Sequence, residues 1–244
     1  MQLTELLALW LEHEQFTNLL EHIKKKNGYR VEYHGIDGSA GDYFLSALAH
    51  YSERPLLLVT ADQAGAEKAY SNLEAFLPGQ VRLLPARELF VSSTILSRSE
   101  EIQHQRLQFI QWLLEGAAGV YVAPLAALLS RNLPPADWQD LTLQFNSGDT
   151  LNREDLIDGL VARGYERSSL TEVPGQFSAR GDIVDIFSPG LGRPVRLELF
   201  DQVLESIRFY DPQNQRSIEK TGSVQIMPAR ELILNNDLYQ EGQK

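Results

Sequence analysis

The sequence predicts an α/β protein of two domains. Residues 1–132 are expected to form a parallel-sheet domain, because short apolar runs alternate there with helical patterns, as in βαβ units. Residues 133–228 are expected to form a small α+β domain with an antiparallel sheet, because closely spaced strand-like runs require hairpins. Residues 229–244 carry no clear packing signal and are expected to be a tail.

In the first domain, residues 2–24 have apolar side chains at helical spacing, and Asn27-Gly28 ends that pattern. Strands are expected at 30–33, 56–60, 81–84 and 119–122. Helices are expected after Ser39 and across 63–76, 100–114 and 124–129.

The boundary between the domains is expected in the segment 131–135, and after it the pattern changes to a strand at 141–145 and a helix at 153–163. Asn152 or a near neighbour is expected to begin this helix. Further strands are expected at 176–180, 183–188, 195–200 and 203–210.

Composition limits the possible functions. The chain has 244 residues, of which 43% are hydrophobic and 23% charged, so it is long enough for two packed domains. It has no cysteine, which excludes disulfides and thiolate metal sites and suits a reducing cytosol. A formal net charge of -11 argues against a general nucleic-acid binder. Because no apolar run is long enough to cross a bilayer, we expect a cytoplasmic protein without membrane contact.

The segment 35–42 resembles a phosphate-binding loop that has lost its chemistry. Such a loop needs glycines, a lysine for the phosphates and a hydroxyl for magnesium. Here the positions are filled by Gly35, Gly38, Ser39, Ala40, Gly41 and Asp42, with Ala40 in place of the second glycine. Gly41 replaces the lysine, and Asp42 puts a carboxylate where a triphosphate would bind. The octapeptide alone is also typical of an ordinary strand-to-helix turn.

Several segments carry a family resemblance. They are 163–167, 174–181, 185–187, 194–200, 205–208 and 215–217, supported in the first domain by 85–90, 105–107 and 122–124. In order and spacing they closely resemble the N-terminal, UvrB-like part of the bacterial transcription-repair coupling factors, the Mfd family. The related helicase UvrB is a poorer match, because residues 85–100 are too few for its DNA-gripping hairpin and contain no tyrosine.

This resemblance implies a degenerate P-loop NTPase-like domain of the UvrB/helicase type, similar to UvrB domain 1a, followed by a domain similar to UvrB domain 2. It also implies an adaptor that performs no ATP chemistry and that recruits the repair protein UvrA to stalled RNA polymerase. The parent protein would be an ATP-dependent DNA translocase. Its contacts with RNA polymerase and DNA would lie beyond residue 244, so the chain is expected to be a truncation.

Alternation in 195–200 places Val195, Leu197 and Leu199 on one face and Arg196, Glu198 and Phe200 on the other. An outward aromatic beside arginines has the composition of an interface hot spot. The same alternation adds Arg180 to the outer face. The resemblance implies UvrA-binding positions at Arg167, Arg180, Arg196 and Phe200. The alternatives are that each arginine is simply solvated and that Phe200 packs under the following turn.

No catalytic or metal site is expected. The five histidines are scattered, and Asp182 and Asp185 lie three apart, on opposite faces of a strand. We therefore expect no cofactor. A second hypothesis is that the first domain keeps weak nucleotide or DNA binding, as a regulatory domain of a UvrB/helicase-like repair protein. Gly41 and Asp42 count against it.

Overall fold

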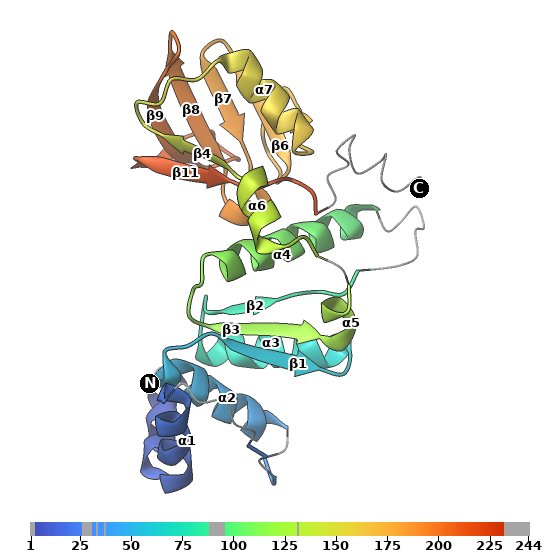
Figure 1. Ribbon diagram of the computed structural model, residues 1–244, viewed down its shortest axis with the longest axis vertical. Coiled ribbons are helices and arrows are strands. Elements are labelled where there is room, and N and C mark those ends of the chain that lie inside the picture. The colour runs from blue at the N-terminus through green and yellow to red at the C-terminus, as the bar shows by residue number, and fades with distance from the viewer. Residues whose placement is uncertain are drawn as a thin grey trace. The chain divides into compact units, whose positions relative to one another are not determined.

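A computed structural model describes residues 3–25, 31–32, 34–36, 38–87, 96–130 and 132–231. It is a mixed α/β structure with a parallel sheet and antiparallel sheets (Figure 1). The chain divides into two compact units. The first contains the described residues up to 87 together with Glu115–Ser130, and the second contains 96–114 and 132–231.

The first unit is built on a parallel three-stranded sheet of order β1-β3-β2. Its elements in chain order are the 3-10 helix η1 (Leu3–Glu12), α1 (Glu14–Lys24), α2 (Ser39–Ser52), β1 (Leu56–Thr60), α3 (Gln63–Phe76), β2 (Val81–Leu83), β3 (Val120–Pro124) and α5 (Leu125–Leu128). Helix α3 begins at Gln63 because the Asp62 carboxylate caps it, accepting a hydrogen bond from Gly65 N at 2.8 Å. Leu73, Val120 and Val122 are buried in the core between helices and sheet.

Two predictions for the first unit are wrong. The single helix expected over 2–24 is interrupted at His13, where η1 ends and α1 begins. The break brings Trp10 against Phe16 and Phe44, with ring centroids 5.6 and 5.1 Å away, so burial of aromatic surface outweighs a continuous helix. The strand expected at 30–33 is not formed at 31 and 32, while 30 and 33 lie outside the described residues.

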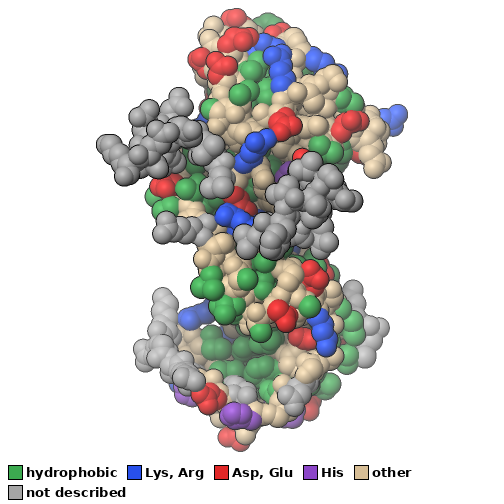
Figure 2. All heavy atoms as spheres, turned by 90° about the vertical axis from the view of Figure 1, so that its right-hand side faces the viewer, with side chains coloured by type: hydrophobic (Ala, Val, Ile, Leu, Met, Phe, Trp, Pro, Cys, Tyr) green, Lys and Arg blue, Asp and Glu red, His purple; other side chains and the backbone are tan. Residues whose placement is uncertain are grey.

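Some apolar side chains of the first unit reach its surface, as Figure 2 shows. Strand β1 alternates between half-buried and exposed positions, and Leu57 and Val59 are exposed. Leu125, the first residue of α5, and Leu129, which follows that helix, are also exposed.

The second unit contains a six-stranded sheet of order β10-β9-β8-β7-β6-β5, antiparallel except for the parallel pair β5–β6. A separate antiparallel pair joins β4 and β11. The elements are α4 (Leu96–Leu114), α6 (Pro135–Leu141), β4 (Leu143–Asn146), α7 (Arg153–Ala162), β5 (Glu166–Arg167), β6 (Gln176–Arg180), β7 (Ile183–Ile186), η2 (Pro189–Leu191), β8 (Val195–Phe200), β9 (Val203–Tyr210), β10 (Ser217–Thr221) and β11 (Ser223–Ile226).

Helix α7 covers one face of the six-stranded sheet (Figure 1). Leu160 of the helix is buried with Phe177, Ile186 and Leu197 of the sheet. The helix begins where the sequence predicts, because Asn152 Oδ1 accepts hydrogen bonds from the backbone N–H groups of Glu154 and Asp155. The strands predicted at 176–180, 195–200 and 203–210 are confirmed.

The packing units differ from the expected domains in two respects. Helix α4, expected in the first domain, groups with the second unit. Residues 229–231, expected in the tail, are packed: Ala229 and Glu231 are buried, and Glu231 pairs with Arg106 of α4. Helix α6 and strands β5, β10 and β11 were not expected from the sequence. The likeness of 1–132 and 133–228 to particular UvrB domains stays a prediction.

Candidate functional site

The face of the six-stranded sheet turned away from α7 carries the candidate site, which we call the outer face. Strand pairing places Ser178, Asp185, Arg196 and Arg208 in one row across β6 to β9. Alternation along the same strands adds Arg180, Ile183, Glu198 and Phe200. The outer face is therefore defined by these eight side chains.

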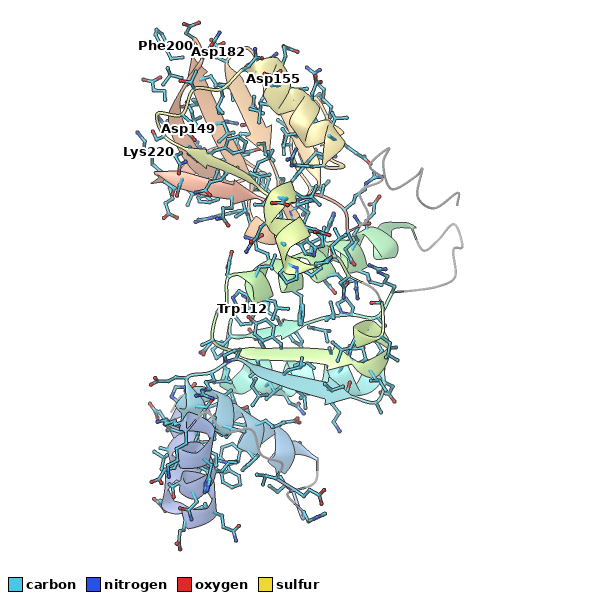
Figure 3. The ribbon with its side chains drawn as sticks, viewed as in Figure 1. Trp112, Asp149, Asp155, Asp182, Phe200 and Lys220 are labelled. Atoms are coloured by element: carbon cyan, nitrogen blue, oxygen red, sulfur yellow. The ribbon has the colours of Figure 1, made fainter. Side chains whose placement is uncertain are left out.

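Phe200 ends strand β8 with 74% of its surface exposed. Its pairing partner is Val203, which is also exposed, across a turn in which Asp201 adopts a φ of 59°. Figure 3 shows Phe200 near Asp182 at one end of the sheet, where Leu199 N donates to Asp182 O at 2.8 Å. The predicted outward direction of Phe200 is confirmed, and packing under the following turn is excluded.

Arg196 is held inside the protein. Its Nε donates to Asp185 Oδ1 at 2.7 Å and its Nη2 donates to Asp185 Oδ2 at 2.9 Å, which makes a two-point fork. Nη2 also donates to Gln215 Oε1 at 3.2 Å, and the guanidinium carbon lies 4.6 Å from the centre of the Tyr210 ring. The Arg196 side chain is 16% exposed, so most of its donor surface already has partners.

The electrostatics agree with this geometry. Hydrogen bonding to Asp185 raises the pKa of Arg196, although burial acts in the opposite direction. Burial, and after it the charge of Asp185, raises the pKa of Tyr210, whose hydroxyl donates to Thr171 O at 3.3 Å. The ion pair of Arg196 and Asp185 therefore lies against the uncharged phenol ring of Tyr210.

Asp185 was missed as a candidate. It is fully buried, and besides Arg196 it accepts a hydrogen bond from Arg180 Nη2 at 3.3 Å on Oδ2. The available signal was a carboxylate in the middle of an apolar strand, with arginines at outer positions of 176–180 and 195–200. Asp182 is exposed in the turn before β7, so the two aspartates do not form a pair.

The four predicted contact residues are only partly brought together. Arg180, with 55% of its side chain exposed, shares the outer face with Arg196. It is the last residue of β6 and precedes the turn in which Asp182 O accepts a hydrogen bond from Leu199 N. Phe200 lies at the same end of the sheet. Arg167 is exposed on edge strand β5, but it pairs with Phe177, a core residue, and so lies on the opposite face from Arg180.

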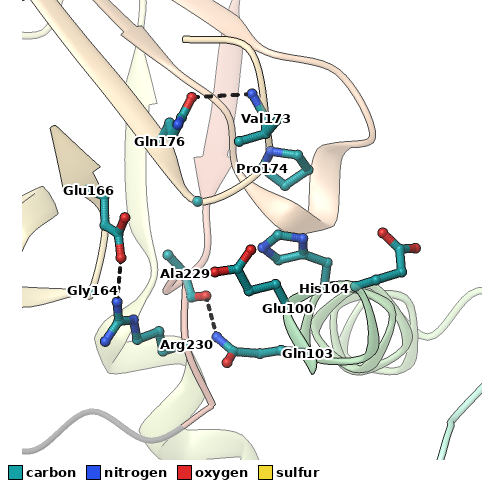
Figure 4. Close-up of a pocket in the computed structure, with 12 residues that line it drawn as sticks. Glu100, Gln103, His104, Gly164, Glu166, Val173, Pro174, Gln176, Ala229 and Arg230 are labelled. Carbon is teal, nitrogen blue, oxygen red and sulfur yellow. Dashed lines mark hydrogen bonds and ion pairs between the residues drawn. The ribbon is translucent and has the colours of Figure 1, made fainter. Parts of the chain in front are cut away.

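A pocket of about 540 Å³ lies in the second unit between α4, the β5–β6 edge and residues 229–230 (Figure 4). Its polar groups are largely paired: Arg230 Nη2 meets Glu166 Oε1 at 2.6 Å, and Gln103 Nε2 donates to Ala229 O at 3.0 Å. Burial lowers the pKa of His104 in its wall, and the charges of Glu101 and Glu100 act against that shift.

At the proposed phosphate loop, Gly35 and Gly38 adopt φ values of 81° and 58°, which favour glycine. Helix α2 begins at Ser39, followed by Ala40 and Gly41, whose N donates to Gly38 O. Asp42 Oδ2 accepts a hydrogen bond of 2.6 Å from Asn72 of α3. The described residues before the loop form no strand, and Asp37 lies outside the description, so the phosphate-loop interpretation stays a prediction.

In the described part of the chain, no cluster of three or more His, Cys, Asp or Glu side chains has the arrangement of a metal site. In the same residues, no helix is long and apolar enough to span a membrane.

Comparison with known proteins assigns this chain to a family. Residues 143–232, which include the whole outer face, match the UvrB interaction domain. The chain is 41% identical over 202 residues to the transcription-repair-coupling factor of Bacillus subtilis, covering 82% of this chain and 17% of the relative. It is 35% identical over 217 residues to that of Myxococcus xanthus (86% and 18%), and 29% identical over 205 residues to that of Staphylococcus aureus (84% and 17%).

Residues 143–232 of the second unit thus belong to the class of UvrB interaction domains. The chain belongs to the transcription-repair-coupling factors, the Mfd family, and corresponds to their N-terminal UvrB-like module. This confirms the resemblance seen in the sequence. The chain spans less than a fifth of the length of these relatives.

Proposed function

We propose that this chain is a non-catalytic adaptor that binds the nucleotide excision repair protein UvrA through the outer face of its second unit. The family match over 143–232 supports this, because a UvrB interaction domain is a docking module. The observation that carries the proposal is Phe200, a large aromatic side chain 74% exposed at the end of that face. Exposed aromatics beside arginines are typical of interface hot spots.

Each candidate residue has its own proposed role. Phe200 inserts into an apolar recess of UvrA, and the exposed Arg180 pairs with a partner carboxylate. Arg196 supports the face from within, since its donors are engaged by Asp185 and Gln215. Arg167 contributes from the sheet edge if the partner reaches around β5.

The first unit is proposed to be a degenerate P-loop NTPase-like domain that no longer binds nucleotide. Asp42 supports this, because its carboxylate lies in the first turn of α2, where a phosphate would bind. The carboxylate accepts a hydrogen bond from Asn72 there. In the longer parent protein, an ATP-dependent DNA translocase, other segments would contact DNA and RNA polymerase. The adaptor would then bring UvrA, in the cytoplasm, to sites where the polymerase has stalled.

The test is calorimetric titration of UvrA with the parent chain and with Phe200→Ala. Removal of this exposed aromatic is expected to weaken binding by at least about 2 kcal/mol, as for other hot spots. The matched control is Val161→Ala, since Val161 is 55% exposed on α7, on the other side of the sheet. Circular dichroism establishes that all three chains are folded.

Parent binding that is lost in Phe200→Ala and kept in Val161→Ala is the expected result. A folded parent that does not bind UvrA would refute the adaptor function. Equal binding by Phe200→Ala and the parent would refute the outer face as its surface.

A further inference from the structure

Asp185 is the only outer-face side chain, among the eight defined above, with no exposed surface at all. Its two oxygens accept three hydrogen bonds, two from Arg196 and one from Arg180. The two arginines come from β6 and β8, the strands on either side of β7. One carboxylate therefore links a mostly buried guanidinium to an exposed one.

The charges of this trio are unequal. Two guanidinium groups and one carboxylate leave a net charge of +1. Arg196 takes both oxygens of Asp185 at 2.7 and 2.9 Å, so its charge is compensated inside the protein. Arg180 contacts a single oxygen at 3.3 Å and is 55% exposed, so the excess positive charge lies at the surface end of the trio.

For partner binding, the orientation of the Arg180 guanidinium matters as much as its charge. A free arginine side chain samples many rotamers, and ordering it on binding opposes association. The contact between Arg180 Nη2 and Asp185 fixes one edge of the guanidinium fork towards the protein. The other edge is then directed outwards, at the end of the sheet that also carries Phe200.

We propose that Asp185 is a positioning residue for partner binding: through its contact with Arg180, it holds the outward edge of that guanidinium ready for a carboxylate of the partner. The proposal rests on the proposed function, because UvrA is the partner considered. Asp185 itself touches no partner, since it has no exposed surface.

The experiment is a double-mutant cycle with UvrA binding as the readout, using Asp185→Asn, Arg180→Ala and the double variant. Asparagine keeps the shape of the side chain and removes its charge. If Asp185 acts through Arg180, Asp185→Asn weakens binding about tenfold in the parent but less than about threefold in the Arg180→Ala background. Asp182→Asn, an exposed change in the neighbouring turn, is the matched control and is expected to bind like the parent.

Additive effects of Asp185→Asn and Arg180→Ala would overturn the proposal. If Asp185→Asn does not fold, Arg180→Lys provides the test, because lysine keeps the charge but has no fork. The proposal requires Arg180→Lys to weaken binding nearly as much as Arg180→Ala. Binding equal to the parent would mean that only the charge matters, and would also overturn it.

Failure of the proposed function is distinguishable from failure of this inference. If the folded parent does not bind UvrA, the function fails, and side-chain NMR then tests the positioning alone. Rotation of the Arg180 guanidinium about its Nε–Cζ bond should be slower in the parent than in Asp185→Asn. Where Asp185→Asn is unfolded, the comparison is with an exposed arginine, Arg216, in the parent. Equally fast rotation would show that Asp185 does not hold Arg180.

Discussion

A carboxylate without solvent contact is stable only when it is paired, and Asp185 depends on Arg196 for that pairing. Its remaining partner, Arg180, is more distant at 3.3 Å and largely solvated. Arg196 and Arg180 of the candidate site therefore differ: Arg196 is paired inside the domain, and Arg180 is exposed to a partner. Substitution of both at once would mix these effects.

Arg196→Ala is expected to lower the free energy of unfolding by about 3 kcal/mol, because it leaves the buried Asp185 with only the single contact from Arg180 at 3.3 Å. Urea denaturation measures the change. The control is Arg208→Ala, where the ion pair with Glu198 at 3.4 Å is partly solvated and worth at most about 1 kcal/mol. Equal losses in the two variants would contradict the structural role of Arg196.

His104 provides a pH dependence with a defined sign. Burial holds its pKa in the folded state below its usual value of about 6.5. The unfolded chain therefore binds the proton more readily, and the contribution of His104 to stability is present above about pH 6.5 and lost as the pH falls below it.

His104→Asn should thus show a smaller fall in melting temperature than the parent when the pH is lowered from about 7.5 to about 5.5. Thermal melts of both chains across that range measure it. A variant whose melting temperature falls as steeply as the parent's would show that His104 is not the group responsible.

At the scale of elements, helix α4 packs against the rest of the second unit through side chains of its C-terminal half. Arg106, 1% exposed, meets Glu231 Oε1 at 2.6 Å, and Leu107 and Ile110 are buried with Trp138 and Met227. The helix also contacts η2 closely at Gly190. These contacts explain why α4 groups with the second unit.

Gly190→Ala tests the fit of α4 against η2. A methyl group at this position would lie 1.4 Å from Gln111 Oε1 and 2.5 Å from its Cδ, so the buried Gln111 side chain must move. We expect a loss of about 1–3 kcal/mol in the free energy of unfolding, the usual cost of overpacking. Urea denaturation is the measurement.

The control uses Gln111→Ala, which removes the obstructing atoms. In that background Gly190→Ala should cost less than in the parent, because only Cβ of residue 111, at 3.3 Å, then remains close to the added methyl group. An unchanged cost would mean that the backbone of η2, and not the contact with α4, needs the glycine.

At the scale of the whole molecule, the second unit carries the proposed docking surface. In the first unit, the carboxylate of Asp42, in the first turn of α2, accepts a hydrogen bond from Asn72. With a net charge of -11 the chain as a whole repels polyanions. Both features favour an adaptor over a nucleotide-dependent enzyme.

We expect Mg-ATP to leave the thermal midpoint of the chain unchanged. A ligand that binds only the folded state stabilises it, by about 2.7 kcal/mol at a concentration of 100 Kd. Differential scanning fluorimetry over a nucleotide series measures this, with magnesium alone as the control. A midpoint that rises and saturates with nucleotide would instead support the hypothesis of a regulatory nucleotide site.

Much of the site was predictable because it depends on local pattern. Alternation in Val195–Phe200 put Arg196 and Phe200 on the outer face, as the burial along β8 confirms. Pattern could not separate Arg196 from Arg180, because both are outward arginines in strands. Their different exposures, 16% and 55%, depend on how Asp185 and the neighbouring loops cover each one.

By itself the sequence determined the period-two strands, the cap of α7 at Asn152, the family and the outward aromatic, because these depend on neighbours in the chain. Only the tertiary structure decided that α4 packs with the second unit and that Glu231 is not part of a free tail. Arg106 and Glu231 are 125 positions apart, and no local pattern specifies such a pair. The burial of Asp185 was decided in the same way, by side chains that three strands bring together.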